Sequence, residues 1–233
     1  MAGKRVLILA NGHWPKAGPS KKVVQDADLT IAADGGWAKA KKHRIPVDLV
    51  VGDLDSLRAE ESTALRASKV QTLVYPREKD KTDLEIALDY AVSLEPRKVV
   101  VFGALGDRLD HTLANILLLE KVASAGVAVE IENGKEHVFI VTNQISLENP
   151  KQGDLVSLLP ISETVEGIRT TGLRFPLNRE SLARPSSRGV SNEVLSAPVE
   201  IRIEKGCLLA IHRAGRSLCT RFDPEANSER CSD

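Results

Sequence analysis

The first 132 residues alternate short apolar runs with longer amphipathic segments, and this alternation limits the possible folds more than any other feature. Short runs of Val, Ile, Leu and Ala without polar alternation are typical of strands buried on both faces of a sheet. We expect such strands at residues 4–10, 29–33, 49–51, 70–74, 98–102 and 127–131. The segments between them predict helices, most clearly over 82–94 and 108–125, where apolar residues recur at helical spacing. This order predicts a Rossmann-like α/β fold, a parallel sheet with flanking helices.

The second half of the chain has a different texture. Beyond about residue 133 helical periodicity fades, and turn residues such as Asn133-Gly134 and Lys205-Gly206 separate short apolar stretches. This pattern predicts a C-terminal antiparallel β-sandwich. We therefore divide the chain into an α/β domain over 1–133, a β-sandwich domain over 134–222 and a polar tail over 223–233. Residues 176–189, which are rich in Arg, Ser and Pro, are expected to form a long loop.

Composition excludes several classes of protein. The 32 basic and 32 acidic residues cancel, so the chain has no general attraction for nucleic acid or anionic membranes. An apolar content of 42% argues against disorder. No apolar stretch approaches the roughly 18 residues of a transmembrane helix, and the run at 6–10 is too short for a signal peptide. We predict a cytoplasmic protein with small-molecule partners, in which Cys207, Cys219 and Cys231 are reduced thiols without metal-site spacing.

Glycine and aspartate residues follow five of the expected strands. They lie at 11–12, 34–36, 52–56, 79–83 and 103–111. The carboxyl ends of parallel strands meet at one edge of a sheet, where ligands bind and small residues let backbone amides approach phosphate. Any one of these loops could be an ordinary turn or helix cap, but five in succession predict a ligand cleft. The chain has no Walker GxxxxGK[ST] or GxGxxG motif, so a nucleotide would be held by another device.

Three aspartates are candidates for a metal site in this cleft. Asp53 and Asp55 are separated by one residue, and Asp83 can join them from a neighbouring strand end. Carboxylates this close repel unless a cation lies between them, and Mg²⁺ prefers such hard oxygen ligands. The alternative is structural, with Asp83 as a helix N-terminal charge and Asp53 as a turn residue. The cationic residues that could neutralise phosphate charge in this cleft are Lys79, Lys81 and Arg108.

The sequence leaves the roles of several histidine and tryptophan residues open. His111 could act as an acid or base, but a His beside Asp at a helix start is at least as often a structural hydrogen-bonding residue. His13 and Trp14 follow the first strand and could close over a base or ring. Trp37 is expected to serve in packing.

At these positions the chain resembles the thiamine pyrophosphokinase family. The similar segments are ADGGWAKA at 33–40, VDLVVGDLDSL at 47–57, YPREKDKTDLEIAL at 75–88, GALGDRLDHTLANILLL at 103–119, GLRFPL at 172–177 and GVSNEV at 189–194. The order and spacing of GDxDS, KDxTD and GxRxDH make the resemblance specific.

The resemblance implies an enzyme that transfers the diphosphate of ATP to the hydroxyl of thiamine, giving thiamine diphosphate and AMP. It implies a homodimer with active sites at the subunit interface and Mg²⁺ as cofactor. Asp53, Asp55 and Asp83 match the metal-binding aspartates, and Arg108 and Asp110 complete the implied catalytic set. The implied nucleotide-binding residues are Asn11, Asp34, Gly35, Asp80, Lys81, Thr82 and Arg108. Ser191 and Asn192 match the segment that meets thiamine.

Two competing functions follow from the same residues. A pyrophosphokinase for another hydroxymethyl compound, such as a pterin, would use the same metal and ATP chemistry, although Ser191 and Asn192 favour thiamine. A non-catalytic nucleotide- or thiamine-binding regulator is the other alternative, but it would have no need of a full metal cluster.

Overall fold

The computed structural model describes residues 3–55, 57–76, 78 and 80–215. Three residues considered above, Lys79, Cys219 and Cys231, lie outside the described residues, as does the tail 223–233. The described part of the chain contains no helix long and apolar enough to cross a membrane.

The α/β half contains a parallel sheet in the order β6-β5-β1-β2-β3-β4. Its strands are β1 (Arg5–Leu9), β2 (Leu29–Ala33), β3 (Leu49–Gly52), β4 (Gln71–Val74), β5 (Lys98–Phe102) and β6 (Ala128–Asn133). Its helices are α1 (Lys21–Gln25), α2 (Gly36–Lys42), α3 (Ala59–Ala67), α4 (Asp83–Ser93) and α5 (Leu109–Ser124). The Rossmann-like parallel sheet predicted from sequence is confirmed.

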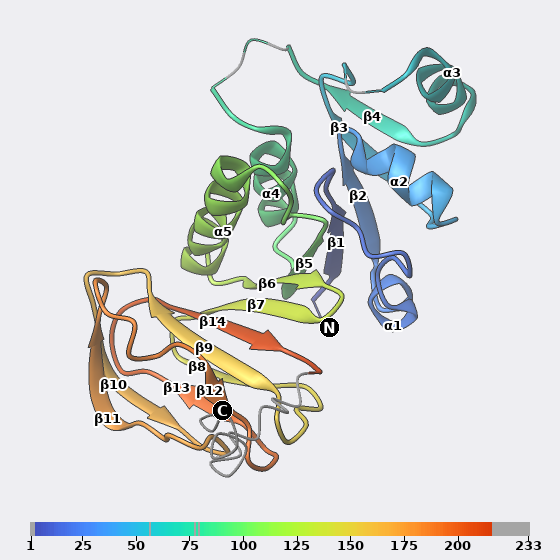
Figure 1. Cartoon of the computed structure of the whole chain (residues 1–233). Helices are drawn as coiled ribbons and strands as arrows, with labels where there is room; N and C mark the ends of the chain where they lie inside the picture. The colour runs from blue at the N-terminus through green and yellow to red at the C-terminus, as the bar shows by residue number, and fades with distance from the viewer. Residues whose placement is uncertain (1–2, 56, 77, 79, 216–233) are drawn as a thin grey trace, which may run out of the picture.

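The central strands are buried on both faces because helices cover both sides of the sheet. Val6 and Ile8 of β1 share a core cluster with residues of α4 and α5, whereas Leu7 and Leu9 belong to a second cluster with residues of α2 and α3. Figure 1 shows the two groups of helices on opposite sides of the strands. Neither strand face meets water, which explains why these runs lack polar alternation.

The antiparallel half grows directly from this sheet. β7 (Glu136–Val141) pairs antiparallel with β6, and the sheet continues through β14 (Leu208–Arg213), β9 (Leu155–Pro160) and β12 (Asn192–Glu193). A second sheet in the order β11-β10-β13-β8 packs against this extension. Its strands are β8 (Gln144–Ser146), β10 (Thr164–Thr170), β11 (Asn178–Ala183) and β13 (Glu200–Arg202). The predicted C-terminal antiparallel β domain is therefore confirmed, and one of its two sheets is continuous with the α/β sheet.

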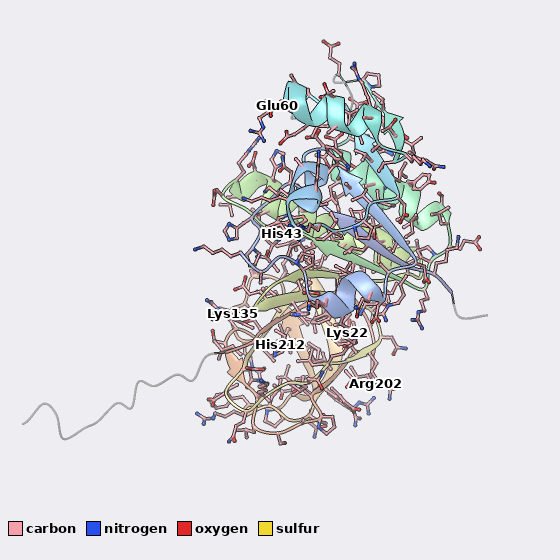
Figure 2. All side chains as sticks on the ribbon, turned by 90° about the vertical axis from the view of Figure 1, so that its right-hand side faces the viewer. Lys22, His43, Glu60, Lys135, Arg202 and His212 are labelled. Atoms are coloured by element: carbon pink, nitrogen blue, oxygen red, sulfur yellow. The ribbon has the colours of Figure 1, made fainter. Side chains whose placement is uncertain are left out.

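Helix α1 also connects the two halves. The Lys22 ammonium forms an ion pair at 3.1 Å with Glu148, which follows β8 in the antiparallel half. Within the α/β half, the Ser20 amide at the start of α1 donates to the Glu132 carboxylate of β6 at 3.3 Å. Figure 2 shows Lys22 at the level where the α/β half meets the antiparallel half.

One local expectation was wrong. Residues 176–189 contain strand β11 rather than only a loop, and this is an edge strand in which Leu182 is the buried residue. Because the strand has one partner and one covered face, its composition remains polar and resembles that of a loop. Helix α5, which was expected over 108–125, buries Leu119 and Val122, whereas Leu113 and Leu117 are 52% and 55% exposed.

Candidate active site

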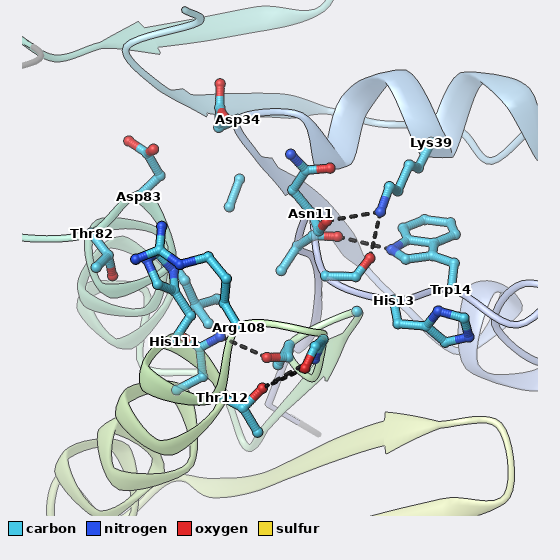
Figure 3. Close-up of a pocket in the computed structure, with 18 of the residues that line it drawn as sticks. Asn11, His13, Trp14, Asp34, Lys39, Thr82, Asp83, Arg108, His111 and Thr112 are labelled. Atoms are coloured by element: carbon cyan, nitrogen blue, oxygen red, sulfur yellow. Dashed lines mark hydrogen bonds between the residues drawn. The ribbon is translucent and has the colours of Figure 1, made fainter. Parts of the chain in front are cut away.

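A cleft of about 1130 Å³ lies at the carboxyl ends of β1, β2, β3 and β5, where the sequence predicted it. Its lining residues all lie between positions 10 and 115. They include Asn11, Asp34, Asp53, Lys81, Thr82, Asp83, Arg108 and His111, all named from sequence. Figure 3 shows several of these side chains converging from different loops. The cleft therefore belongs to the α/β half of the chain.

An acidic cluster occupies one side of this cleft. Carboxylate oxygens of Asp34, Asp53 and Asp83 all lie within 4.8 Å of one another. The Oδ1 atoms of Asp34 and Asp83 are buried, so the surrounding protein shields them from water. Asp34 adopts a left-handed φ of 46° directly after β2, a conformation that Asp tolerates better than most residues. Three carboxylates at this separation form a donor set suited to a hard divalent cation.

Asp55 is placed differently from the other two aspartates of the predicted metal site. Its side chain is exposed, and its amide donates to Oδ1 of Asp53 at 3.1 Å. Among the described residues the three-carboxylate group contains Asp34 in its place. Direct metal binding by Asp55 therefore stays a prediction, and Asp34, assigned above to the nucleotide loops, joins the acidic cluster.

The segment before α4 has structural as well as site contacts. The Thr82 hydroxyl caps α4 by accepting from the Glu85 amide at 3.2 Å, and the Lys81 ammonium pairs with Asp89 at 2.8 Å. Both residues line the cleft, whereas Asp80 is exposed and does not. The KDxTD motif thus begins a helix and brings Asp83 into the cluster.

Arg108 and Asp110 form a two-point ion pair at the start of α5. Nη2 of Arg108 lies 2.6 Å from Oδ2 of Asp110, and Nε lies 3.3 Å from Oδ1. This hydrogen bonding raises the pKa of Arg108 and holds the pKa of Asp110 below its ordinary value. Both side chains are about two-thirds exposed, so phosphate oxygens can compete for the guanidinium.

Two glycine-containing loops form another wall of the cleft. The Gly12 amide donates to the Gly103 carbonyl at 2.7 Å, and the His13 amide donates to the Leu105 carbonyl at 2.6 Å. A Cβ at Gly12 would clash with both carbonyl oxygens, so the close approach requires glycine.

Sequence reasoning missed Lys39, which lines the cleft from α2. Its ammonium donates to the carbonyls of Asn11 and Gly12. Its contacts go to backbone atoms, so no motif signalled it; the only hint was its place one turn after Gly35-Gly36. Gly35 is the N-cap of α2 and lies in an adjoining hollow that also contains Asn11.

The remaining ring-bearing residues are also placed. Trp37 is 5% exposed in the core, which confirms its packing role. Trp14 lines the cleft, but its ring packs edge-on against Phe102 at 5.0 Å and is tilted against His43. His13 and His111 line the cleft as well.

Ser191 and Asn192 do not line the cleft of their own chain. The Asn192 side chain instead holds Phe175: its Oδ1 accepts from the Phe175 amide at 3.0 Å, and its Nδ2 donates to the Phe175 carbonyl at 2.8 Å. Ser191 is exposed with a left-handed φ of 60°, and the Phe175 side chain is 68% exposed. This exposed aromatic residue, whose backbone is held by the neighbour of Ser191, was not identified from sequence, although it lies in the quoted GLRFPL segment.

Comparisons with known proteins agree across both halves. Residues 20–131 match the family model described as thiamin pyrophosphokinase, catalytic domain, and residues 142–208 match thiamin pyrophosphokinase, vitamin B1 binding domain. A thiamine pyrophosphokinase of Bacillus subtilis is 31% identical over 168 residues, which are 72% of this chain and 78% of the relative.

Solved structures show the same similarity. The crystal structure of thiamine pyrophosphokinase from Bacillus subtilis has a TM-score of 0.80 at 26% identity, over 91% of this chain and 100% of that chain. The structure of the Geobacillus thermodenitrificans protein of the same name has a TM-score of 0.77 at 28% identity, over 91% and 99%. The similarity therefore covers both the cleft and the antiparallel half.

Proposed function

The chain belongs to the thiamine pyrophosphokinase family, and we propose that the cleft of its α/β half is where ATP gives its diphosphate to thiamine. The reaction joins the thiamine hydroxyl oxygen to the β-phosphorus, breaks the bond between that phosphorus and the oxygen of AMP, and releases the hydroxyl proton. Attack on phosphorus depends mainly on alignment and charge neutralisation. The acidic cluster beside Arg108 is the observation that supports this proposal most directly.

We propose that Asp34, Asp53 and Asp83 hold Mg²⁺. The buried oxygens and short mutual separations suit a hard cation, and no soft or nitrogen ligand belongs to the described cluster. Bound Mg²⁺ would neutralise polyphosphate charge. Asp55 is proposed to act through its amide contact with Asp53, which sets the conformation of this loop.

Arg108 is proposed to bind the phosphates. Its pair with Asp110 preorganises the guanidinium at the start of α5, and exchange of one Asp110 contact for phosphate keeps the charge paired. Asn11, Gly35 and the 80–82 segment are proposed to complete the nucleotide site. Thr82 would serve chiefly by capping α4.

We propose that a second copy of the chain completes the thiamine site. Ser191, Asn192 and Phe175 lie outside the chain's own cleft, so they can meet bound thiamine only if another copy brings them there. Large exposed apolar residues occur on both surfaces that such a pairing would cover: Leu109, Leu113 and Leu117 of α5, and Phe175, Val190 and Leu195 around β12. Phe175 would give thiamine's pyrimidine a flat apolar surface.

The decisive test incubates the purified protein with ATP, Mg²⁺ and thiamine and quantifies AMP and thiamine diphosphate together. We expect equal amounts of the two products and none without Mg²⁺. A parallel reaction contains a pterin alcohol instead of thiamine; AMP formed only there would replace thiamine by a pterin. Binding of ATP or thiamine without either product would favour the regulatory alternative. We also propose a cytoplasmic location, in line with the reduced thiols expected from the sequence.

A further inference from the structure

Lys39 makes an unusual set of contacts for a lysine on a helix. Its ammonium donates to two consecutive backbone carbonyls, those of Asn11 at 2.8 Å and of Gly12 at a shorter distance. Burial lowers the pKa of this ammonium, yet no carboxylate pairs with it at ion-pair distance among the described residues. Figure 3 shows Lys39 on the opposite side of Asn11 from Asp83 and Arg108. Lys39 therefore holds the two carbonyls toward α2 and away from the acidic and basic groups of the cleft.

Further hydrogen bonds connect the loop that Lys39 holds, residues 10–13, to the rest of the cleft. Nε1 of Trp14 donates to the preceding carbonyl, that of Ala10, at 2.9 Å. Three consecutive carbonyls at 10–12 are thus occupied by side-chain donors. The amides of Gly12 and His13 continue into the 103–106 loop, as described above.

The 103–106 loop is in turn fixed by α5. The Asn115 side chain donates to the Ala104 carbonyl at 2.6 Å, and the Thr112 hydroxyl contacts both the amide and the carbonyl of Gly106. The same helix begins directly after Arg108. A change at Lys39 can therefore reach Arg108 through two hydrogen-bonded loops.

These contacts affect the charge that the cleft wall would present to a bound phosphate. Carbonyl oxygens carry partial negative charge, which a bound ammonium offsets. Without Lys39, the partial negative charge of the Asn11 and Gly12 carbonyls would no longer be offset, and it would disfavour a polyphosphate in the cleft. Loss of the ammonium would also remove a positive charge from the cleft wall.

We propose that Lys39 is a positioning residue for the nucleotide, which keeps two loop carbonyls away from the phosphate site and supplies positive charge behind them. The proposal rests on the proposed function in that the cleft must bind ATP. It assigns Lys39 no contact with the reacting atoms.

The test compares Lys39→Met with Lys39→Arg and with Lys69→Met as a control that also removes one lysine charge. Lys69 is exposed between α3 and β4 and lines neither the cleft nor the adjoining hollow. The dissociation constant of Mg·ATP is measured by calorimetry without thiamine, and the KM values of ATP and thiamine are measured separately.

We expect Lys39→Met to weaken ATP binding at least tenfold while the thiamine KM changes less than twofold. Lys39→Arg should restore affinity to within about threefold, because a guanidinium can donate to both carbonyls. Lys69→Met should bind ATP like the wild type. A purely structural role would instead lower the melting temperature and the active fraction without changing the ATP dissociation constant, and that result would overturn the proposal.

If Lys39→Met does not give a native circular dichroism spectrum, Lys39→Gln takes its place, because the amide can still donate to one carbonyl. An intermediate loss of ATP affinity supports the proposal, and wild-type affinity overturns it. Failure of the proposed function would be seen in a different measurement, because the wild-type protein would then make no thiamine diphosphate. The comparison of ATP dissociation constants would still decide the role of Lys39.

Discussion

Asp34 and Asp55 are placed differently with respect to the acidic cluster. Asp34 contributes an oxygen to the three-carboxylate group, whereas Asp55 is exposed beside it. We expect Asp34→Asn to lower kcat/KM about a hundredfold or more and to raise the Mg²⁺ concentration needed for half-maximal rate. Asp55→Asn is the matched comparison and should cost less. Steady-state rates over a Mg²⁺ titration measure both, and an equal or larger loss for Asp55→Asn would assign Asp55 to the metal.

Cys207 offers a residue-scale test of the core. Burial raises the pKa of its thiol to about 11, so almost none of it is thiolate at pH 8. In a Cys219→Ser, Cys231→Ser variant, we expect a thiol reagent at pH 8 to react more than about a hundredfold faster in denaturing urea than in buffer. Fast reaction of the folded variant would show that Cys207 is accessible.

The sequence could predict site residues where the chemistry resides in side chains that follow a strand. Asp53 and Asp83 are examples, because parallel strands bring their carboxyl ends to one edge. Lys39 could not be predicted in this way, since it acts on the carbonyls of a loop whose conformation depends on the 103–106 segment. Phe175 was hidden for a related reason: its exposure depends on how Asn192 holds its backbone.

At the scale of secondary-structure elements, Asp154 ties the turn before β9 to the end of β14. Its carboxylate lies 2.9 Å from Nε2 of His212 and accepts from the amides of Lys151 and Gly215. Burial disfavours the charged carboxylate, but these hydrogen bonds outweigh burial and hold the pKa of Asp154 below its ordinary value. A lowered folded-state pKa means that the stabilisation is complete above the unfolded pKa of about 4 and is lost as pH falls through the folded value.

This sign gives a prediction for unfolding. We expect the urea midpoint of the wild type to exceed that of Asp154→Asn at pH 6, and the difference to shrink as pH falls from about 5 toward 3. Urea titrations followed by circular dichroism measure both midpoints. A difference that stays constant with pH would mean that the charge of Asp154 does not contribute to stability.

Helix α5 and strand β11 show which structural information a sequence pattern lacks. Helix α5 carries apolar residues at 109, 113 and 117 and again at 119 and 122, so periodicity alone offers two candidate faces. The packing of α5 against β6, β7 and α4 selects the second. Strand β11 has the composition of a loop because it forms an edge of the four-stranded sheet.

At the scale of the whole molecule, the continuous sheet carries the candidate thiamine segment away from its own cleft. The cleft is lined only by residues between 10 and 115, while β12 is the edge strand of the ten-stranded sheet, at the opposite end from β4. Figure 1 shows β12 within the antiparallel half, beyond β6 and β7. A shared site would therefore combine the cleft of one chain with the 175–192 region of another.

Such sharing predicts complementation between two damaged chains. Asp83→Asn should inactivate the cleft, and Phe175→Ala should weaken thiamine binding, so each variant alone should have little activity at low thiamine. In a mixed dimer both changes fall in one site, and the other site is intact. Random exchange makes half of the dimers mixed, so an equal mixture should recover about a quarter of wild-type activity.

The measurement is thiamine diphosphate formation after subunit exchange, with the Asp83→Asn, Phe175→Ala double variant mixed with itself as control. Activity no higher than the average of the two separate variants would place the complete site within one chain.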